Sequence, residues 1–299
     1  MDIDIDKQFY CLFLFYYLCD RIIIGVIMKK GIICIGSILI IIVGGLIYYL
    51  DNKKYNFKIY VFNAGKADAI IISKNNKYVM IDTGEDTLSD EILEYFKKNN
   101  IKKLEYLIIT HFDKDHVGSA SSIIDNIEIG EVLQSNYIKE SEYYSNYVES
   151  LEKKNIEPIT VEGEYGFFID GVKFIVNGPN EIYDNEESNN SSLIVSITNK
   201  DNSFLFMGDS ENARIKDFLS SNNETFDFIK VPYHGNYLKR LEDLLKQIKP
   251  KYGVITCSKK EGCDNKTLKL LDEYDVDSYL TRAGSVSISS DGKKIKVLQ

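Results

Sequence analysis

The sequence predicts an α/β protein in which two β-sheets pack face to face, with helices outside them and a transmembrane helix in front. Three observations lead to this expectation. From Asn56 onward, short β-rich runs alternate with amphipathic helical patterns. No linker rich in Pro, Gly or Ser divides residues 56–299, so we expect a single domain there. Upstream of it, Gly31–Leu50 is an apolar run without a charged residue.

The apolar run favours a membrane span over a buried core helix, because it lacks a polar face and is flanked by charges. Lys29 and Lys30 precede it, and Asp51 follows it. A helix of this length measures about 30 Å, the thickness of a bilayer core. No small-residue cleavage site follows, so we expect an uncleaved, single-pass anchor in the cell membrane. The positions of Lys and Arg weakly favour an extracytoplasmic C-terminal domain.

Residues 1–27 form an unusual extension in front of this anchor. Phe9–Cys19 is apolar but too short to span a membrane, and Asp20 and Arg21 interrupt the pattern. Met28, followed by two lysines and the span, makes an ordinary anchor by itself. We therefore expect native translation to start at Met28 and residues 1–27 not to be translated.

The charge and the cysteines narrow the function further. A formal net charge of −9 argues against a broad electrostatic grip on nucleic acid, although local basic patches stay open. Three of the five cysteines lie in the apolar N-terminal sequence. The other two, Cys257 and Cys263, lack the spacing of a zinc or redox motif. A disulfide in an oxidising compartment and two free thiols are equally compatible with this pair.

The expected elements follow one another in a regular order. Strands are expected at residues 57–63, 69–73, 78–82, 104–110, 129–133, 172–176, 193–198, 203–207, 226–231, 252–256, 285–289 and 294–298. Helices are expected at residues 89–98, 141–154, 211–220, 238–248 and 266–274. Ser89 caps the first of these helices. Three tyrosines on the second suggest either a substrate lid or an aromatic face packed on the sheet, and we favour packing.

The strand expected at residues 104–110 runs directly into a dense group of donors. His111, Asp113, Asp115 and His116 lie within six positions, and small residues follow them. Imidazoles and carboxylates crowded at a strand end are best reconciled by a divalent cation between them. We therefore interpret this stretch as a metal-binding loop that leads into a helix.

Other strand ends carry further donors. Asp209 and His234 follow two later strands, and Asp82 follows an earlier one. Strand ends of a sandwich meet along one edge, so these side chains can converge. The donor set suits Zn²⁺ or the harder Mn²⁺, as one or two ions, and such an ion supplies hydroxide by lowering the pKa of bound water to about 7. Asp82 more plausibly orients the loop by hydrogen bonding than binds metal.

Several segments carry a resemblance when taken in order. They are Val61–Ile70, Thr110–Gly118, Asn189–Leu193, Phe206–Asp209, Lys230–Gly235 and Tyr279–Gly284. Together they resemble the metallo-β-lactamase superfamily, specifically the hydrolase domain of ComEC-type competence proteins and their stand-alone relatives. The resemblance covers residues 56–299 and implies the four-layer αβ/βα sandwich and metal-dependent hydrolysis.

The resemblance also implies roles for individual residues. The metal residues it implies are His111, Asp113, Asp115, His116, Asp209 and His234, with Asp209 bridging if two ions bind. Asp115 and His116 are the expected catalytic residues, and Asp115 also takes a proton. Asp82, Asn189 and Ser192 are expected to lie behind the metal residues and to support them without binding metal.

The sequence also departs from the family pattern. Asp113 replaces a histidine, and the histidine expected near residues 189–192 is missing, so one metal pocket has lost imidazoles. Tyr233 replaces the first histidine of a His-His-Gly motif, and residues 262–265 differ from the Tyr-Gly-His-Pro of many relatives. The last two changes, at Tyr233 and at residues 262–265, bear on the substrate more than on metal binding.

Three functions are compatible with these residues. The first is a membrane-anchored metallo-hydrolase that uses a metal-bound hydroxide on phosphodiesters, including nucleic acid or a small molecule. The second keeps the fold and metal but acts on an ester, amide or lactone. The third is a degenerate, non-catalytic binding module, against which the complete group of Asp115, His116, Asp209 and His234 argues.

Overall fold

A computed structural model describes residues 41–46, 54–180 and 188–299 of the chain. The chain divides into two compact units, Met1–Tyr55 and Asn56–Gln299. In the first unit, residues 41–46 are helical. No helix within the described residues is long and apolar enough to cross a membrane. The extension 1–27 and most of the expected span, Gly31–Leu50, lie outside the described residues, so the anchor stays a prediction.

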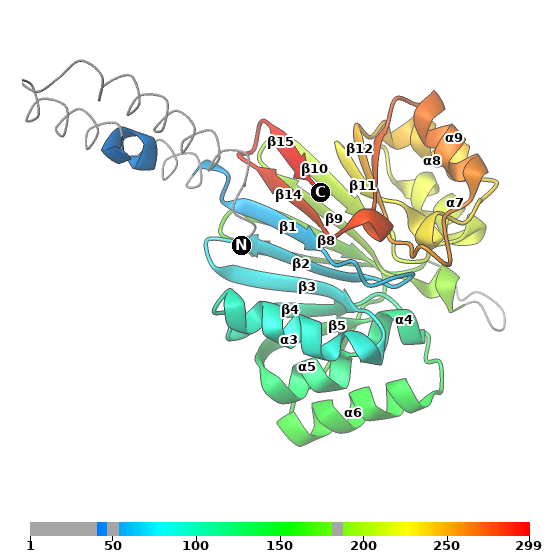
Figure 1. The fold of residues 1–299 in the computed structure, drawn as a ribbon. Coiled ribbons are helices and arrows are strands. Elements are labelled where there is room, and N and C mark those ends of the chain that lie inside the picture. Colours follow the sequence, from blue (N-terminus) through cyan, green and yellow to red (C-terminus); the bar gives the residue numbers. More distant parts are fainter. Residues whose placement is uncertain (1–40, 47–53, 181–187) are drawn as a thin grey trace, which may run out of the picture. The chain divides into compact units, whose positions relative to one another are not determined.

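The second unit is built on two β-sheets (Figure 1). The first sheet has the strand order β15 (Ile295–Leu298), β14 (Val286–Ser290), β1 (Phe57–Val61), β2 (Ala69–Lys74), β3 (Lys77–Thr83), β4 (Lys103–Ile109), β5 (Glu128–Gln134) and β6 (Ile159–Thr160). The second has the order β13 (Asp277–Leu280), β12 (Tyr252–Ile255), β11 (Phe228–Lys230), β10 (Asn202–Phe206), β9 (Ile194–Asn199), β8 (Val172–Asn177) and β7 (Glu164–Ile169).

Helices cover the outer face of each sheet (Figure 1). The first sheet is covered by α3 (Ser89–Lys98), α5 (Ala120–Asn126) and α6 (Glu142–Lys154), and the short α4 (Lys114–Val117) precedes α5. The second is covered by α7 (Asn212–Ser221), α8 (Leu241–Ile248) and α9 (Asn265–Glu273). The predicted layered sandwich of sheets and helices is thereby confirmed.

Three apolar clusters hold these layers together. One fills the space between the sheets, and each of the other two lies between a sheet and its helices. In the central cluster, the rings of Phe57 from β1 and Phe204 from β10 lie with centroids 5.0 Å apart. Strand β1 has the alternating pattern of a strand with one face in this cluster, because its first, third and fifth residues are buried and the two between them are not.

Strand direction determines where a site can form. Strands β3, β4 and β5 run parallel to one another, as do β10, β11, β12 and β13. Parallel strands present all their carboxyl ends at one edge, where the connecting loops gather ligand-binding side chains. Each sheet therefore contributes several loops to the site.

The strands that the sequence did not predict are β6, β7 and β13, and each lies at an edge of its sheet. An edge strand pairs on one side only and packs less of its surface, so its apolar pattern is weak. Strand β7 contains Gly166, and Phe168 on the same strand is 69% exposed. Strand β13 begins with Asp277 and Ser278, both exposed.

The tyrosines of α6 belong to the apolar layer, as the packing interpretation predicts. Tyr147 is fully buried, and its hydroxyl donates to Gln134 Oε1 at 2.8 Å. Tyr144 lies edge-on to Phe112, with ring centroids 4.7 Å apart. These contacts fix the helix on the sheet directly beside the loop that carries His111.

The sandwich core yields a stability prediction. Phe204→Ala removes a fully buried ring between the sheets, so we expect it to lower the free energy of unfolding by about 3–5 kcal/mol. Phe168→Ala, on the exposed face of β7, is the control and should change it by less than about 0.5 kcal/mol. Chemical denaturation measures both. Equal losses for the two variants would show that the sheets do not pack as described.

Candidate metal centre

The candidate site lies at the edge where the carboxyl ends of parallel strands from both sheets meet. The first sheet supplies Asp82 at the end of β3 and the loop after β4, which leads into α4. The second supplies Asp209 after β10 and His234 in the turn Pro232–Gly235 after β11. The layered fold thus brings together residues that are more than a hundred positions apart in the sequence.

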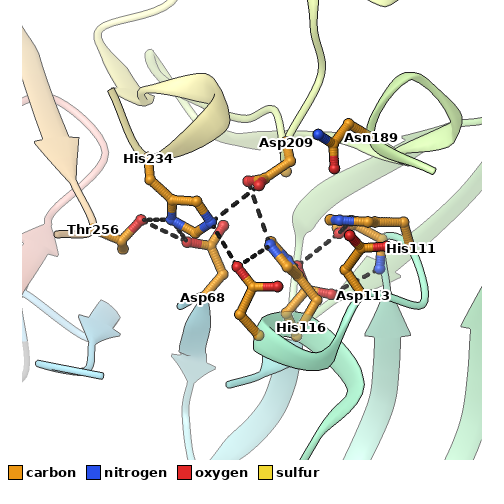
Figure 2. A network of polar contacts seen from close by, with 12 residues as sticks. Asp68, His111, Asp113, His116, Asn189, Asp209, His234 and Thr256 are labelled. Atoms are coloured by element: carbon orange, nitrogen blue, oxygen red, sulfur yellow. Dashed lines mark hydrogen bonds and ion pairs between the residues drawn. The ribbon is translucent and has the colours of Figure 1, made fainter. Parts of the chain in front are cut away.

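Four of these side chains form a compact group. Possible ligand atoms of Asp115, His116, Asp209 and His234 all lie within 4.8 Å of one another (Figure 2). One oxygen of Asp209 lies 3.3 Å from His116 Nε2, and the other lies 3.0 Å from His234 Nε2. Asp115 Oδ2 lies 3.2 Å from His234 Nε2. The Asp209 carboxylate therefore spans the two imidazoles.

The hydrogen bonding of this group fits a divalent cation. Among the described residues, the buried atoms without a hydrogen-bond partner include Nε2 of His111, His116 and His234, and Oδ1 of Asp209. A buried polar atom without a partner costs free energy, so four at one place call for an additional ligand. Imidazole nitrogens and carboxylate oxygens are ligands of Zn²⁺ and related ions.

Asp82 holds His116 from behind, in the orienting position that the sequence predicts for it. Its Oδ2 atom lies 2.7 Å from His116 Nδ1 and accepts from Thr110 Oγ1, also at 2.7 Å. Its other oxygen accepts from the Thr110 backbone N–H at 2.7 Å. A carboxylate on one ring nitrogen fixes the tautomer and directs the other nitrogen into the site. Asp82 adopts a left-handed backbone with φ of 53°, which asparagine and aspartate tolerate better than most other non-glycine residues.

A second buried network holds His234, and the sequence did not predict it. His234 Nδ1 lies 2.9 Å from Thr256 Oγ1, which donates to Asp68 Oδ1 at 2.7 Å (Figure 2). The other oxygen of Asp68 pairs with the fully buried Lys230 Nζ at 2.5 Å. Lys230 also donates to the Gly208 carbonyl at 3.0 Å.

The sequence contained a signal for part of this network. Lys230 interrupts an apolar strand, and a lysine at such a position is buried only when an anion faces it. Nothing in the sequence identifies that anion as Asp68, which lies more than 150 positions earlier.

His111 and Asp113 lie beside the compact group. The His111 ring lies 4.0 Å from that of His116 between centroids, and its Nδ1 atom lies 3.1 Å from Thr110 Oγ1. The Asp113 carboxylate accepts from Ser188 and forms an ion pair with Lys139 Nζ at 2.9 Å. The Lys139 ammonium group therefore faces Asp113, in the metal pocket where the sequence lacks the histidines of the family pattern.

Asn189 and Ser192, which the resemblance places behind the metal residues, differ in their contacts. Ser192 Oγ accepts from the Asp209 backbone N–H at 3.1 Å and lies 3.4 Å from His111 Nδ1, so Ser192 links the two parts of the site. The Asn189 amide donates to Glu211 at 2.8 Å. Metal binding by the side chains that the resemblance implies as ligands stays a prediction, and their positions support it.

The charges of the group are strongly coupled. Burial alone lowers the pKa of His116, but the Asp209 and Asp82 carboxylates outweigh it and hold the pKa well above its usual value. Burial also lowers the pKa of His234, but Asp209 and Asp115 outweigh it and raise the pKa above its usual value. Burial and the charge of His116 lower the pKa of His111 to about 3. Protons on His116 and His234 thus balance the carboxylates when no metal does.

Known proteins share this fold. The family model described as Metallo-beta-lactamase superfamily matches residues 63–259, more than half of the chain. The crystal structure of the metallo-beta-lactamase fold protein YhfI from Bacillus subtilis is similar, with a TM-score of 0.51 and 10% identity, and the match covers 75% of this chain and 95% of YhfI. The chain therefore belongs to the metallo-beta-lactamase superfamily.

Two curated proteins are similar in sequence. Recombination protein 2 of Haemophilus influenzae is 26% identical over 219 residues, which cover 71% of this chain and 25% of that protein. ComE operon protein 3 of Bacillus subtilis is 24% identical over 190 residues, which cover 62% of this chain and 24% of that protein. The match spans about a quarter of the length of either relative. These similarities confirm the ComEC-type resemblance, and fold and His/Asp cluster together support the predicted metal-dependent hydrolase.

The geometry predicts a graded loss of metal on substitution. His116→Ala and His234→Ala each remove a donor nitrogen, so we expect purified protein to lose its bound transition metal. Asp82→Asn keeps the donor but weakens its orientation, and should lower metal affinity by about 10–100-fold. Asp272→Ala, on the exposed face of α9, is the control and should retain full occupancy. Elemental analysis and competition with a chelator measure these effects.

Circular dichroism should show that each of these variants is folded. Wild-type protein without metal above background would contradict the assignment, as would full occupancy in folded His116→Ala.

The raised histidine pKa values predict that metal binding depends on pH. The raised pKa values favour the protonated form of both imidazoles in the metal-free protein, and a metal must displace those protons. Apparent affinity should rise by about tenfold per pH unit for each proton displaced. The stabilisation that these protons give the metal-free protein is present at low pH and is lost as pH rises through the folded pKa.

Calorimetry in buffers of different ionisation enthalpy counts the released protons. An affinity that does not change between about pH 6 and 8 would contradict the protonation described here.

Proposed function

We propose that this protein is a membrane-anchored, metal-dependent phosphodiesterase. The observation that carries the proposal is the group of Asp115, His116, Asp209 and His234. Its imidazole Nε2 atoms are buried and make no well-aligned hydrogen bond, although carboxylate oxygens lie within 3.3 Å of them. Such a group suits a hydrolytic metal centre better than a structural zinc site, which is usually closed by cysteine and histidine alone.

The chain's own residues divide the work at this centre. His116, Asp209 and His234 would hold the ion, and Asp82 and Thr256 keep the two imidazoles oriented. A divalent ion bound there supplies a Lewis acid and lowers the pKa of water. Asp115 has a side chain that is 28% exposed, whereas the others are nearly inaccessible, so it is the member that substrate and water reach.

Asp115 is also the proposed proton acceptor. Burial opposes ionisation, but the charges of His116 and His234 outweigh it and lower the pKa of Asp115. When metal displaces the imidazole protons, the divalent ion would supply the positive charge in their place, so the carboxylate would stay ionised and able to take a proton from the attacking water. In this proposal Asp115 and His116 are the catalytic residues, as the sequence resemblance implies.

The relatives support phosphodiesters as substrates. One is named Recombination protein 2 and another belongs to the ComE operon, and the resemblance extends to ComEC-type hydrolase domains. A nucleic acid or a smaller phosphodiester fits this proposal, with Mn²⁺ or Zn²⁺ as the ion. The net charge of −9 favours a competing proposal, in which the same centre hydrolyses an ester, amide or lactone.

The proposed location rests on the sequence of Gly31–Leu50. Its apolar run and flanking charges support a single membrane anchor, and the distribution of lysines and arginines supports a hydrolase domain outside the cytoplasm. An anchored phosphodiesterase would then meet its substrates at the cell surface.

A substrate panel tests the proposed chemistry. The full chain, loaded with Mn²⁺ or Zn²⁺, is assayed on bis-p-nitrophenyl phosphate, single-stranded DNA, a lactone and a β-lactam. We expect hydrolysis of the first two and a decrease of about 10²-fold or more in Asp115→Asn, because the amide cannot accept the proton. Asp272→Asn is the matched control and should retain wild-type rates.

The panel distinguishes the competing functions. Turnover confined to the lactone or β-lactam rejects the phosphodiesterase and supports the second candidate. A metal-loaded wild type that hydrolyses none of the four substrates supports a non-catalytic module instead.

A further inference from the structure

A pair of cysteines lies beside the metal centre and takes no part in the proposed hydrolysis. Cys257 lies two positions after the end of β12 and is buried, whereas Cys263 is half-buried. The chain between them turns back on itself, because Ser258 N donates to Glu261 O at 3.1 Å and Glu261 N donates to Ser258 Oγ at 2.8 Å. Cys257 belongs to the apolar cluster between the second sheet and its helices, and Cys263 packs against the same cluster. The turn thus keeps the two thiols close enough for each to shift the pKa of the other.

Each cysteine adjoins a group that positions His234. Thr256, immediately before Cys257, lies 2.9 Å from His234 Nδ1 through its hydroxyl. Asp264, immediately after Cys263, donates its backbone N–H to the Gly235 carbonyl at 3.0 Å. A Cβ atom on Gly235 would lie only 2.8 Å from Cys263 Cβ, so the backbone beside His234 packs directly on this cysteine.

The two sides of the pair differ in how firmly they are held. Cys257 is fixed by Thr281, whose Oγ1 accepts from the Cys257 backbone N–H at 3.0 Å and donates to its carbonyl at 3.2 Å. Residues 259–262, on the other side, are exposed. A covalent bond between the sulfurs would tie the exposed turn to the fixed strand end.

We propose that Cys257 and Cys263 form a reversible disulfide that clasps the turn 258–262 against the strand end and thereby slows loss of metal from His234. This inference rests on the proposed metal centre for its consequence, though not for the bond itself. Neither the fold family nor the hydrolytic chemistry requires such a pair.

The proposed reaction is thiol–disulfide exchange with an oxidant that is itself a disulfide, such as oxidised glutathione. The Cys263 thiolate, on the less buried of the two residues, attacks the oxidant disulfide, forms a mixed disulfide and releases one thiol of the oxidant. The Cys257 thiolate then attacks the Cys263 sulfur and releases the second thiol. Two protein thiols are oxidised, one oxidant disulfide is reduced to two thiols, and the protons of Cys257 and Cys263 pass to these thiols.

The surroundings favour the second step and slow the first, because the hydrogen bond with Cys257 and burial raise the pKa of the Cys263 thiol well above its usual value. A hydrogen bond from Cys263 and the nearby Arg282 guanidinium lower the pKa of Cys257 to about 6, despite the opposing effect of burial. Arg282 Nη1 lies 3.3 Å from the position that a Cβ on Gly262 would occupy, which places this cation against the turn. A thiolate next to a cation is the reactive form in exchange.

The test combines a peptide map with a measurement of metal release. Full-length protein loaded with Zn²⁺ is equilibrated in glutathione buffers of graded ratio, alkylated and digested. We expect a peptide pair joined at Cys257 and Cys263 and lighter by two hydrogens. Transfer of Zn²⁺ to a coloured chelator should be about tenfold slower from the oxidised than from the reduced protein. This is the lower end of the change in metal affinity that follows substitution of a group hydrogen-bonded to a metal-bound histidine.

Matched variants isolate the pair. Cys257→Ser and Cys263→Ala should each abolish the redox dependence of Zn²⁺ release, whereas Cys34→Ser leaves the pair intact and should behave as wild type. Absence of the joined peptide at every glutathione ratio overturns the proposal. Equal release rates from oxidised and reduced wild type overturn it as well.

Failure of the metal centre gives a different result. If reduced wild-type protein takes up no Zn²⁺, the proposed centre is wrong. The clasp is then judged by the joined peptide and by amide hydrogen exchange of residues 258–264, which the disulfide should slow in wild type only. Unchanged exchange would reject the clasp.

Discussion

The balance of charge among carboxylates gathered at one edge of the sandwich is the constraint on which the rest of the site depends. Asp68, Asp82 and Asp209 are buried there, and Asp115 lies beside them. Buried carboxylates must be matched by positive charge or strong donors, since otherwise they take up protons. Lys230 provides one fixed positive charge. The histidines supply the remainder, either as imidazolium groups or as ligands of a cation.

The fold meets this constraint with rigid supports on both sides. His116 is held by Asp82 from the first sheet, and His234 by Thr256 from the second. The backbone of His234 is left-handed, with φ of 52°, an arrangement that costs free energy in a residue other than glycine and persists only when its surroundings enforce it. Precision at the centre thus comes from packing of the two sheets, and the proposed clasp would act on the least buried part of that support.

The sequence predicted helices and strands correctly where burial alternates with exposure, or persists, in a regular pattern along the segment. Strands packed on both faces, such as β4 with its apolar end at residues 106–109, and amphipathic helices such as α8 carry that environment in their residue pattern. The edge strands β6, β7 and β13 lack it, because half of their surroundings is solvent. Local pattern did not distinguish these three strands from loops, although it did predict β15 at the other edge of the first sheet.

By itself, the sequence determined the layered fold and the dense donor loop from His111 to His116, because periodicity and close spacing are local properties. It also identified Asp209 and His234 as strand-end candidates. Only the tertiary structure decided that Asp68 and Lys230 form a buried pair behind His234, and that Lys139 faces Asp113. The physical reason is that a charge partner is selected by distance in space and by burial. Neither quantity exists until both sheets have packed.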